Sequence, residues 1–192
     1  MDREQPLALK EWAVTVNALL SGELICVMRK GGIHEETKKF EVKAPQFLLM
    51  PAYEHQKEHL LKPAYQGRIM DTIKLFEQNP NVMTINGYAD VIEDIELYDE
   101  AAVASLFHEH IWTEQFATER FKWKKTHPLH LLILRTYQFA EPIELQMQPT
   151  YTGCKSWITV EEQVKLGHAT PVLNDEQFNE KREAIKRALN LV

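Results

Sequence analysis

The chain has 192 residues, of which 44% are hydrophobic and 26% are charged. These values are ordinary for a globular protein, so they exclude a disordered, collagen-like or coiled-coil chain. The 22 Lys and Arg residues are outnumbered by 28 Asp and Glu residues, which gives a formal net charge of −6. That balance excludes a basic coat over the whole surface but leaves room for a local basic patch.

Two cysteines, Cys26 and Cys154, are too few for a disulfide framework, and they lack the CxxC spacing of zinc and redox sites. No apolar run approaches the roughly 20 residues that cross a bilayer. The first ten residues carry charges where a secretory signal would be apolar. We therefore expect a cytoplasmic protein with reduced thiols and no membrane contact.

The first quarter of the chain predicts a helix followed by a small sheet. Apolar residues at helical spacing behind Pro6 predict a first helix that ends at Gly22. The apolar residues 24–28 predict a strand, and Gly31 and Gly32 then predict a turn.

Further strands are predicted at 40–42, where apolar and charged residues alternate, and at 47–50, which is apolar. Residues 53–62 favour a helix, and a helical stripe at 69–76 predicts another. Asn86-Gly87 lies between two strand-like runs, which predicts a β-hairpin over 82–92.

In the second half, an amphipathic helix is predicted over 103–111. Residues 129–139 predict a strand that is apolar on both faces, as in the middle of a sheet. A short strand or turn follows at 157–160, and an amphipathic C-terminal helix is expected over about 174–190, capped by Asn174. These elements predict the α+β class, with one compact domain over 1–192 and a central mixed or antiparallel sheet flanked by helices.

The segment 120–125 combines cations with aromatic rings. Arg120 and Lys122 could neutralise phosphates while Trp123 stacks on an unpaired base, a common mode of single-strand binding. The alternative is that the aromatic residues anchor the core and the cations are merely solvated.

Arg29, Lys30, Gly31 and Gly32 follow a predicted strand, where backbone amides and two cations could hold an anion. The spacing is not that of a nucleotide-binding P-loop, so an ordinary tight turn is the alternative. Arg135 lies on the most apolar predicted strand, so it needs either an anionic ligand or a structural ion pair.

Two patterns bear on metal chemistry. Residues 55–59 match HxxEH, which can hold zinc on a helix, and Glu41-Val42-Lys43 matches the ExK ending of many nucleases. Neither pattern comes with an identifiable further ligand. We therefore expect no cofactor and no metal site, and a divalent ion only if the protein is a hydrolase.

Several short segments together resemble one known family: 10–13, 29–33, 47–51, 53–56, 111–112, 134–137 and 153–157. Up to about residue 160, the chain is similar to an uncharacterised bacterial family catalogued as domain of unknown function 1802. Some relatives occur with restriction-type endonuclease domains, which implies nucleic-acid work by association. The same resemblance marks a second candidate polar site at Tyr53, His55 and Gln56.

We therefore expect a nucleic-acid-associated binding or accessory module, with a link to restriction-type systems implied by the resemblance. A metal-assisted phosphodiester hydrolase and a small-molecule or protein-interaction domain are the alternatives. The candidate contacts to nucleic acid or phosphate are Arg29, Lys30, Gly31, Gly32, Arg120, Lys122, Trp123 and Arg135. The first expectation requires these distant cations to meet at one concave, positively charged surface.

Overall fold

The protein is described by a computed structural model that places residues 5–30, 40–123, 127–153, 155–161, 164 and 167–192. These residues form a seven-stranded sheet in the order β2-β5-β4-β3-β1-β6, and β7 pairs with β5. Strands β1 and β3 pair in parallel, whereas the other pairs described are antiparallel. With its helices, this mixed sheet confirms the predicted α+β class.

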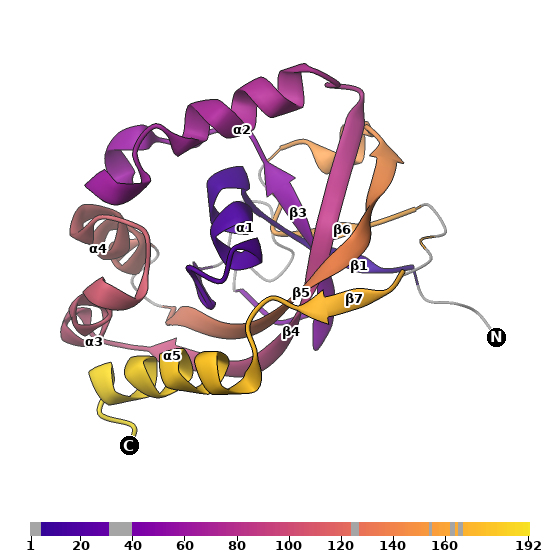
Figure 1. Ribbon diagram of the computed structural model, residues 1–192. Helices are drawn as coiled ribbons and strands as arrows, with labels where there is room; N and C mark the ends of the chain where they lie inside the picture. The colour runs from indigo at the N-terminus through magenta and orange to yellow at the C-terminus, as the bar shows by residue number, and fades with distance from the viewer. Residues whose placement is uncertain (1–4, 31–39, 124–126, 154, 162–163, 165–166) are drawn as a thin grey trace.

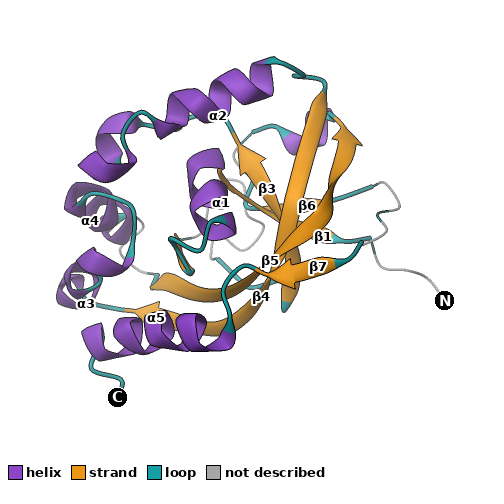
Figure 2. Cartoon of the chain, in the orientation of Figure 1, coloured by secondary structure: helices purple, strands orange, loops and turns teal. Residues whose placement is uncertain are grey.

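The elements are labelled in Figure 1 and coloured by type in Figure 2. The strands are β1 Leu7–Trp12, β2 Cys26–Arg29, β3 Gln46–Ala52, β4 Val82–Leu97, β5 Leu129–Gln146, β6 Trp157–Thr159 and β7 Ala169–Pro171. The α-helices are α1 Ala13–Leu20, α2 Arg68–Glu77, α3 Glu100–Ser105, α4 Glu114–Lys122 and α5 Asp175–Ala188.

The sheet has a hydrophobic core on each face. The helices lie to one side of the sheet (Figure 1), and the larger core fills the space between them and the strands. A smaller core covers the other face. In β1 and β3, neighbouring residues alternate between the two cores: Leu9 and Leu49 belong to the larger core, and Ala8 and Leu48 to the smaller. This is the side-chain alternation that a strand covered on both faces requires.

Strand β5 contains the run at 129–139 that was predicted to lie in the middle of the sheet. It is an interior strand, as predicted, but it lies next to the edge strand β2 and extends to Gln146. It pairs with β2 on one side and β4 on the other. The side chains from Leu131 to Leu134 are fully buried. The C-terminal helix is also confirmed, because α5 begins after Asn174, whose side chain accepts a hydrogen bond from the Gln177 amide in a capping box.

The first predicted helix is wrong in its first half. Residues from Leu7 to Trp12 form β1, and the helix begins only at Ala13. Leu9 is buried in the strand, and the predicted helix would also have placed it on the buried face. Its spacing to the later apolar residues therefore did not distinguish a strand from a helix. Pairing with β3 and β6 decides the conformation.

The predicted hairpin at Asn86-Gly87 is also wrong, because β4 runs without a turn through both residues. The register of β4 against β5 shifts between Ile85 and Gly87. A β-carbon on Gly87 would lie 2.1 Å from the carbonyl oxygen of Tyr137. The glycine therefore permits a close backbone approach within the sheet.

Other local predictions differ from the structure in smaller ways. Residues 40–42 are not a strand, and 53–62 contains only a short 3₁₀ turn at Glu58–Leu60 in place of a helix. His55 has a left-handed φ of 61°, which interrupts any helix there. The helix predicted over 103–111 ends at Ser105 and is followed by a 3₁₀ turn, Phe107–Glu109.

Candidate functional site

A pocket of about 230 Å³ lies where β1, β2 and β3 end. Because β1 and β3 are parallel, their carboxyl ends meet at one edge of the sheet, where open α/β sheets commonly bind ligands. The pocket is lined by Lys10, Glu11, Trp12, Arg29, Lys30, Ala52, Glu54, His55, Arg120, Gly153, Lys155 and Ser156.

Curling of the sheet brings β2 to this pocket. Strand β2 forms one edge of the sheet, and β1 lies next to the opposite edge strand, β6. Nevertheless Arg29, at the end of β2, donates a hydrogen bond from Nη1 to Glu11 Oε2 of β1 at 2.8 Å. The two ends of the sheet therefore approach each other, as in a partly closed barrel, and side chains distant in the chain share one cavity.

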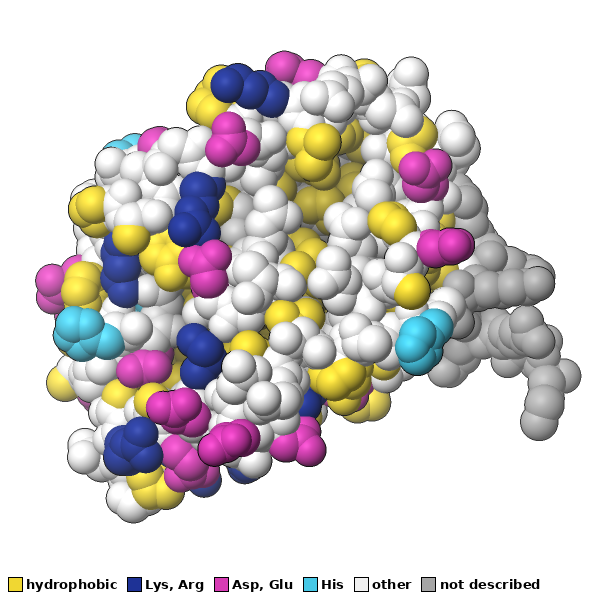
Figure 3. All heavy atoms as spheres, viewed as in Figure 1, with side chains coloured by type: hydrophobic (Ala, Val, Ile, Leu, Met, Phe, Trp, Pro, Cys, Tyr) yellow, Lys and Arg dark blue, Asp and Glu magenta, His cyan; other side chains and the backbone are white. Residues whose placement is uncertain are grey.

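The pocket is positively charged although the protein is acidic. Among the described lining residues, five side chains are cationic and two are carboxylates, an excess of three positive charges when His55 is neutral. The face shown in Figure 3 differs, because basic and acidic side chains are interspersed there without a large patch of one sign. The cationic lining is thus a local feature of the pocket.

Glu11 and Arg29 form a buried ion pair on the floor, each 7% exposed. Glu11 also accepts a hydrogen bond from the amide of Trp12 at 3.1 Å, and the Arg29 guanidinium lies 5.6 Å from the centre of the Phe40 ring. Arg29 Nε is buried without a hydrogen-bond partner among the described residues. Glu11 therefore fixes the orientation of Arg29 but leaves one of its donors unused.

Two lysines are also held in the floor, each 8% exposed. Lys10 Nζ donates a hydrogen bond to the carbonyl of Gly153 at 2.8 Å. Lys30 Nζ donates to the carbonyl of Phe121 and lies 4.9 Å from the centre of that ring. Burial lowers the pKa of Lys30. Both of these hydrogen bonds go to neutral carbonyl oxygens, which hold the ammonium groups in place at the floor.

Arg120 enters from α4. Its Nε donates to the Met28 carbonyl at 3.2 Å, and its guanidinium lies 5.3 Å from the centre of the Phe116 ring. Burial lowers the pKa of Arg120 to about 10; Glu11 counteracts this effect, and Arg29 adds to it. The group remains charged at neutral pH. Its terminal nitrogens have no hydrogen-bond partner among the described residues, and these donors are suited to an anion.

The predicted polar site at Tyr53, His55 and Gln56 divides into different roles. His55 is exposed and lines the pocket. Gln56 accepts a hydrogen bond from the amide of Val14 at 3.1 Å and thereby holds the start of α1 beside the pocket. Tyr53 stacks on the Phe76 ring at 4.1 Å between centroids.

The structure brings only some of the predicted nucleic-acid contacts together. Arg29, Lys30 and Arg120 line the pocket, whereas Lys122 and Trp123 do not. Lys122 is half exposed and pairs with Glu100 at 3.0 Å, and Trp123 is 49% exposed at the end of α4. Gly31 and Gly32 lie outside the described residues.

Arg135 is elsewhere in the protein. Its Nη2 donates to Asp175 at 2.7 Å, and its guanidinium lies 4.7 Å from the centre of the Phe178 ring. Both partners belong to α5. Of the two partners considered for Arg135, an anionic ligand or a structural ion pair, the structure contains the ion pair. This pair joins the start of α5 to the sheet.

Sequence reasoning missed Lys10, Glu11, Glu54 and Lys155 as site residues. Each lies in or beside a segment that carries the family resemblance, and those segments converge on the pocket with 29–33. That resemblance was the available signal. Residue chemistry alone did not reveal them, because no charge run or ligand spacing marks them.

No cluster of three or more His, Cys, Asp or Glu side chains suited to a metal ion occurs in the part of the chain that the structure describes. His55 and His59 do not share a helix, so the HxxEH pattern lacks the backbone geometry that it needs. Among the described helices, none has the length and apolar character to span a bilayer.

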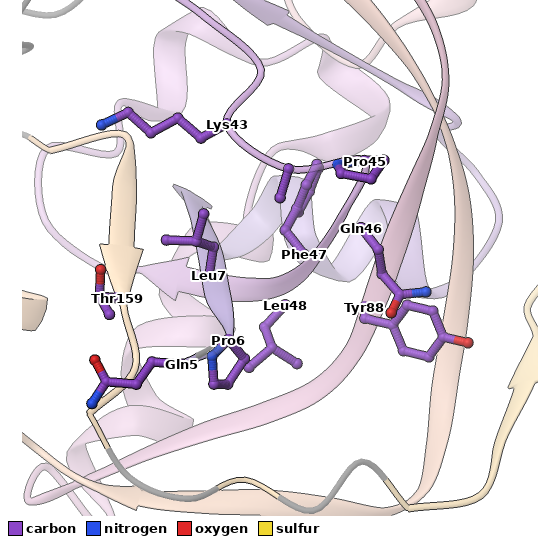
Figure 4. A pocket seen from close by; sticks show the side chains of 11 residues that line it. Gln5, Pro6, Leu7, Lys43, Pro45, Gln46, Phe47, Leu48, Tyr88 and Thr159 are labelled. Carbon is purple, nitrogen blue, oxygen red and sulfur yellow. The ribbon is translucent and has the colours of Figure 1, made fainter. Parts of the chain in front are cut away.

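A larger pocket, of about 560 Å³, lies at the opposite ends of β1 and β3. Figure 4 shows Gln46 and Tyr88 on one side of it and Gln5 and Thr159 on the other. Lys43 is the one charged side chain among its described lining residues. This pocket therefore lacks the concentrated charge of the smaller one.

The fold and pocket define an α+β protein with a cationic cavity at the carboxyl ends of a parallel strand pair. The chain belongs to the family described as Domain of unknown function (DUF1802), whose model matches residues 8–184. No curated protein matches the chain.

The solved structures similar to this chain include ASCH from Zymomonas mobilis. It is 12% identical, with a TM-score of 0.42, over 93% of this chain and 93% of that chain. A serine-to-alanine mutant of the same protein is 13% identical, with a TM-score of 0.42, over 94% of this chain and 96% of that chain. Similarity at this level carries no information on function.

Proposed function

We propose that this protein is a nucleic-acid-associated binding module that acts in the cytoplasm and holds a phosphate group of the nucleic acid in the cationic pocket. One observation carries the proposal: five cationic side chains from distant parts of the chain line a single pocket in a protein of net charge −6. Three of the five, Lys10, Arg29 and Lys30, are at most 8% exposed, and holding like charges this close together in a partly buried site is unfavourable without an anion. A phosphate would offset that repulsion.

The lining residues have separate roles in this proposal. Arg120 and Lys155 have no carboxylate partner among the described residues, so they contact the phosphate directly. Lys10 and Lys30 add positive charge from the floor, and Glu11 positions Arg29. Trp12 is half-buried at the pocket and supplies an apolar surface for the adjoining sugar or base. An accessory role beside restriction-type systems is part of the proposal on the strength of the family resemblance.

Binding of a fluorescent single-stranded oligonucleotide, measured by anisotropy in EDTA over a range of salt concentrations, tests the proposal. We expect affinity to fall with salt, with a slope of about −0.7 per phosphate contact. Arg120→Ala removes charge-assisted hydrogen bonds of about 1.5–3 kcal/mol, so affinity should fall by roughly 10- to 100-fold. Lys155→Ala should make the salt slope shallower by about 0.7.

Lys122→Ala is the matched control. Lys122 lies two residues from Arg120 on the same helix, but outside the pocket and paired with Glu100. Its replacement should change affinity less than twofold. The proposal is wrong if no salt-dependent binding occurs, or if this control weakens binding as much as Arg120→Ala. Cleavage of the oligonucleotide only after addition of Mg²⁺ would instead indicate a metal-assisted hydrolase.

A further inference from the structure

We propose that the pocket binds a phosphomonoester at the end of a nucleic-acid strand in preference to an internal phosphodiester. This inference rests on the proposed function and names the ligand group more narrowly. It follows from the burial of three cations that line the pocket, from their charge and from the donors that have no partner among the described residues.

The cationic floor lies below an exposed rim. Lys10, Arg29 and Lys30 are at most 8% exposed, whereas His55 and Lys155 at the rim are exposed. The volume of 230 Å³ equals that of about eight water molecules at roughly 30 Å³ each. This is room for a phosphate with part of its sugar. A phosphate inside a strand is linked to a sugar on both sides, whereas a terminal phosphate has one such link and can turn its remaining oxygens toward these cations.

The charge of the lining also matches a terminal phosphate. A phosphomonoester carries about −1.5 to −2 at pH 7, whereas a phosphodiester carries one negative charge. The excess of three positive charges on the described lining residues is therefore neutralised more fully by the monoester. In a partly buried site this difference counts for more than it would in water.

The donors near the floor add a geometric reason. The terminal nitrogens of Arg120 have no hydrogen-bond partner among the described residues. Arg29 Nε also lacks a partner among them, but it is fully buried, so Arg29 contributes charge rather than a contact through this atom. Guanidinium groups bind phosphate oxygens through paired hydrogen bonds. A phosphomonoester has three terminal oxygens for these donors, but a diester has two. The pocket can therefore satisfy more of its donors with the terminal group.

The test compares oligonucleotides of one sequence that differ only at their unlabelled end. One pair carries a 5′ phosphate or a 5′ hydroxyl, and the other a 3′ phosphate or a 3′ hydroxyl, with fluorescein at the opposite end. We expect one phosphorylated strand to bind at least tenfold more tightly than its hydroxyl counterpart, measured by anisotropy in EDTA. A nucleoside monophosphate with the same phosphate position should compete for that strand.

Three variants test whether the cationic pocket causes the preference for a terminal phosphate. Lys155→Ala changes an exposed side chain, so the fold should persist, and it should reduce the preference at least threefold. Arg120→Ala should abolish it, with circular dichroism as the check on folding, and Lys122→Ala should preserve it. Equal, salt-dependent binding of phosphate- and hydroxyl-ended strands overturns this inference but leaves the proposed function standing. Absence of binding by every strand overturns both.

Discussion

Acidification should destabilise the fold through His110, which is 4% exposed. Burial, with a further contribution from the ammonium of Lys62, lowers the pKa of His110 to about 3. Neither ring nitrogen makes a hydrogen bond of ordinary geometry with the described residues, and the nearby backbone of Trp112 only partly counteracts the effect of burial. The folded protein therefore holds a neutral imidazole, and protonation requires either a buried unpaired charge or unfolding.

The magnitude follows from the two pKa values of His110. The folded value of about 3 lies below the ordinary value of 6.5, so the unfolded chain binds the proton more readily. The stability contribution is fully present above pH 6.5 and is lost as the pH falls toward 3. Each pH unit in that window lowers the free energy of unfolding by about 1.4 kcal/mol. The full loss, about 5 kcal/mol, rivals the total stability of a marginal domain.

Urea unfolding of the wild type and His110→Leu at pH 7.5 and pH 5.0 measures this effect. Leucine is apolar and of similar volume, so the variant lacks the titration without a large cavity. From pH 7.5 to pH 5.0 the wild type should lose about 2 kcal/mol more free energy of unfolding than the variant. Carboxylates titrate in both proteins and cancel in the difference. Equal losses in the two proteins would refute the assignment of a buried neutral His110.

Three further outcomes are expected. Gly87→Ala should lower the free energy of unfolding by at least about 2 kcal/mol, because the added methyl group meets the backbone of Tyr137. Gly167→Ala is the control, because open space surrounds Gly167, and it should change the free energy of unfolding by less than about 0.5 kcal/mol. Urea unfolding measures both variants, and similar values for the two would count against the predicted clash. Glu11→Gln should lower the free energy of unfolding by about 3 kcal/mol in the same assay, because Arg29 stays buried without its counter-charge. An unchanged free energy of unfolding would mean that Arg29 finds another partner. Burial raises the pKa of Cys26 to about 12, so peptide mapping after iodoacetamide at pH 8 should find it modified only in urea; modification in native buffer would contradict this burial.

Local chemistry predicted the elements whose residues carry one dominant signal. The capping residue Asn174 and the amphipathic stripe behind it define α5, and the run at 129–139 that is apolar on both faces identifies an interior strand. The start of the chain failed because Leu9 satisfies strand and helix patterns alike. Gly87 failed because glycine serves tight turns and close backbone approaches equally well, and only the neighbouring strand decides between them.

The sequence by itself determined the α+β class, the family resemblance and the presence of cations at Arg29, Lys30 and Arg120. Only the tertiary structure decided that these three face one cavity while Lys122 and Arg135 pair with carboxylates elsewhere. The physical reason is that charge is a property of each residue, whereas its surroundings depend on pairings between distant strands. The approach of β2 to β1 across the curled sheet is such a pairing, and no local pattern encodes it.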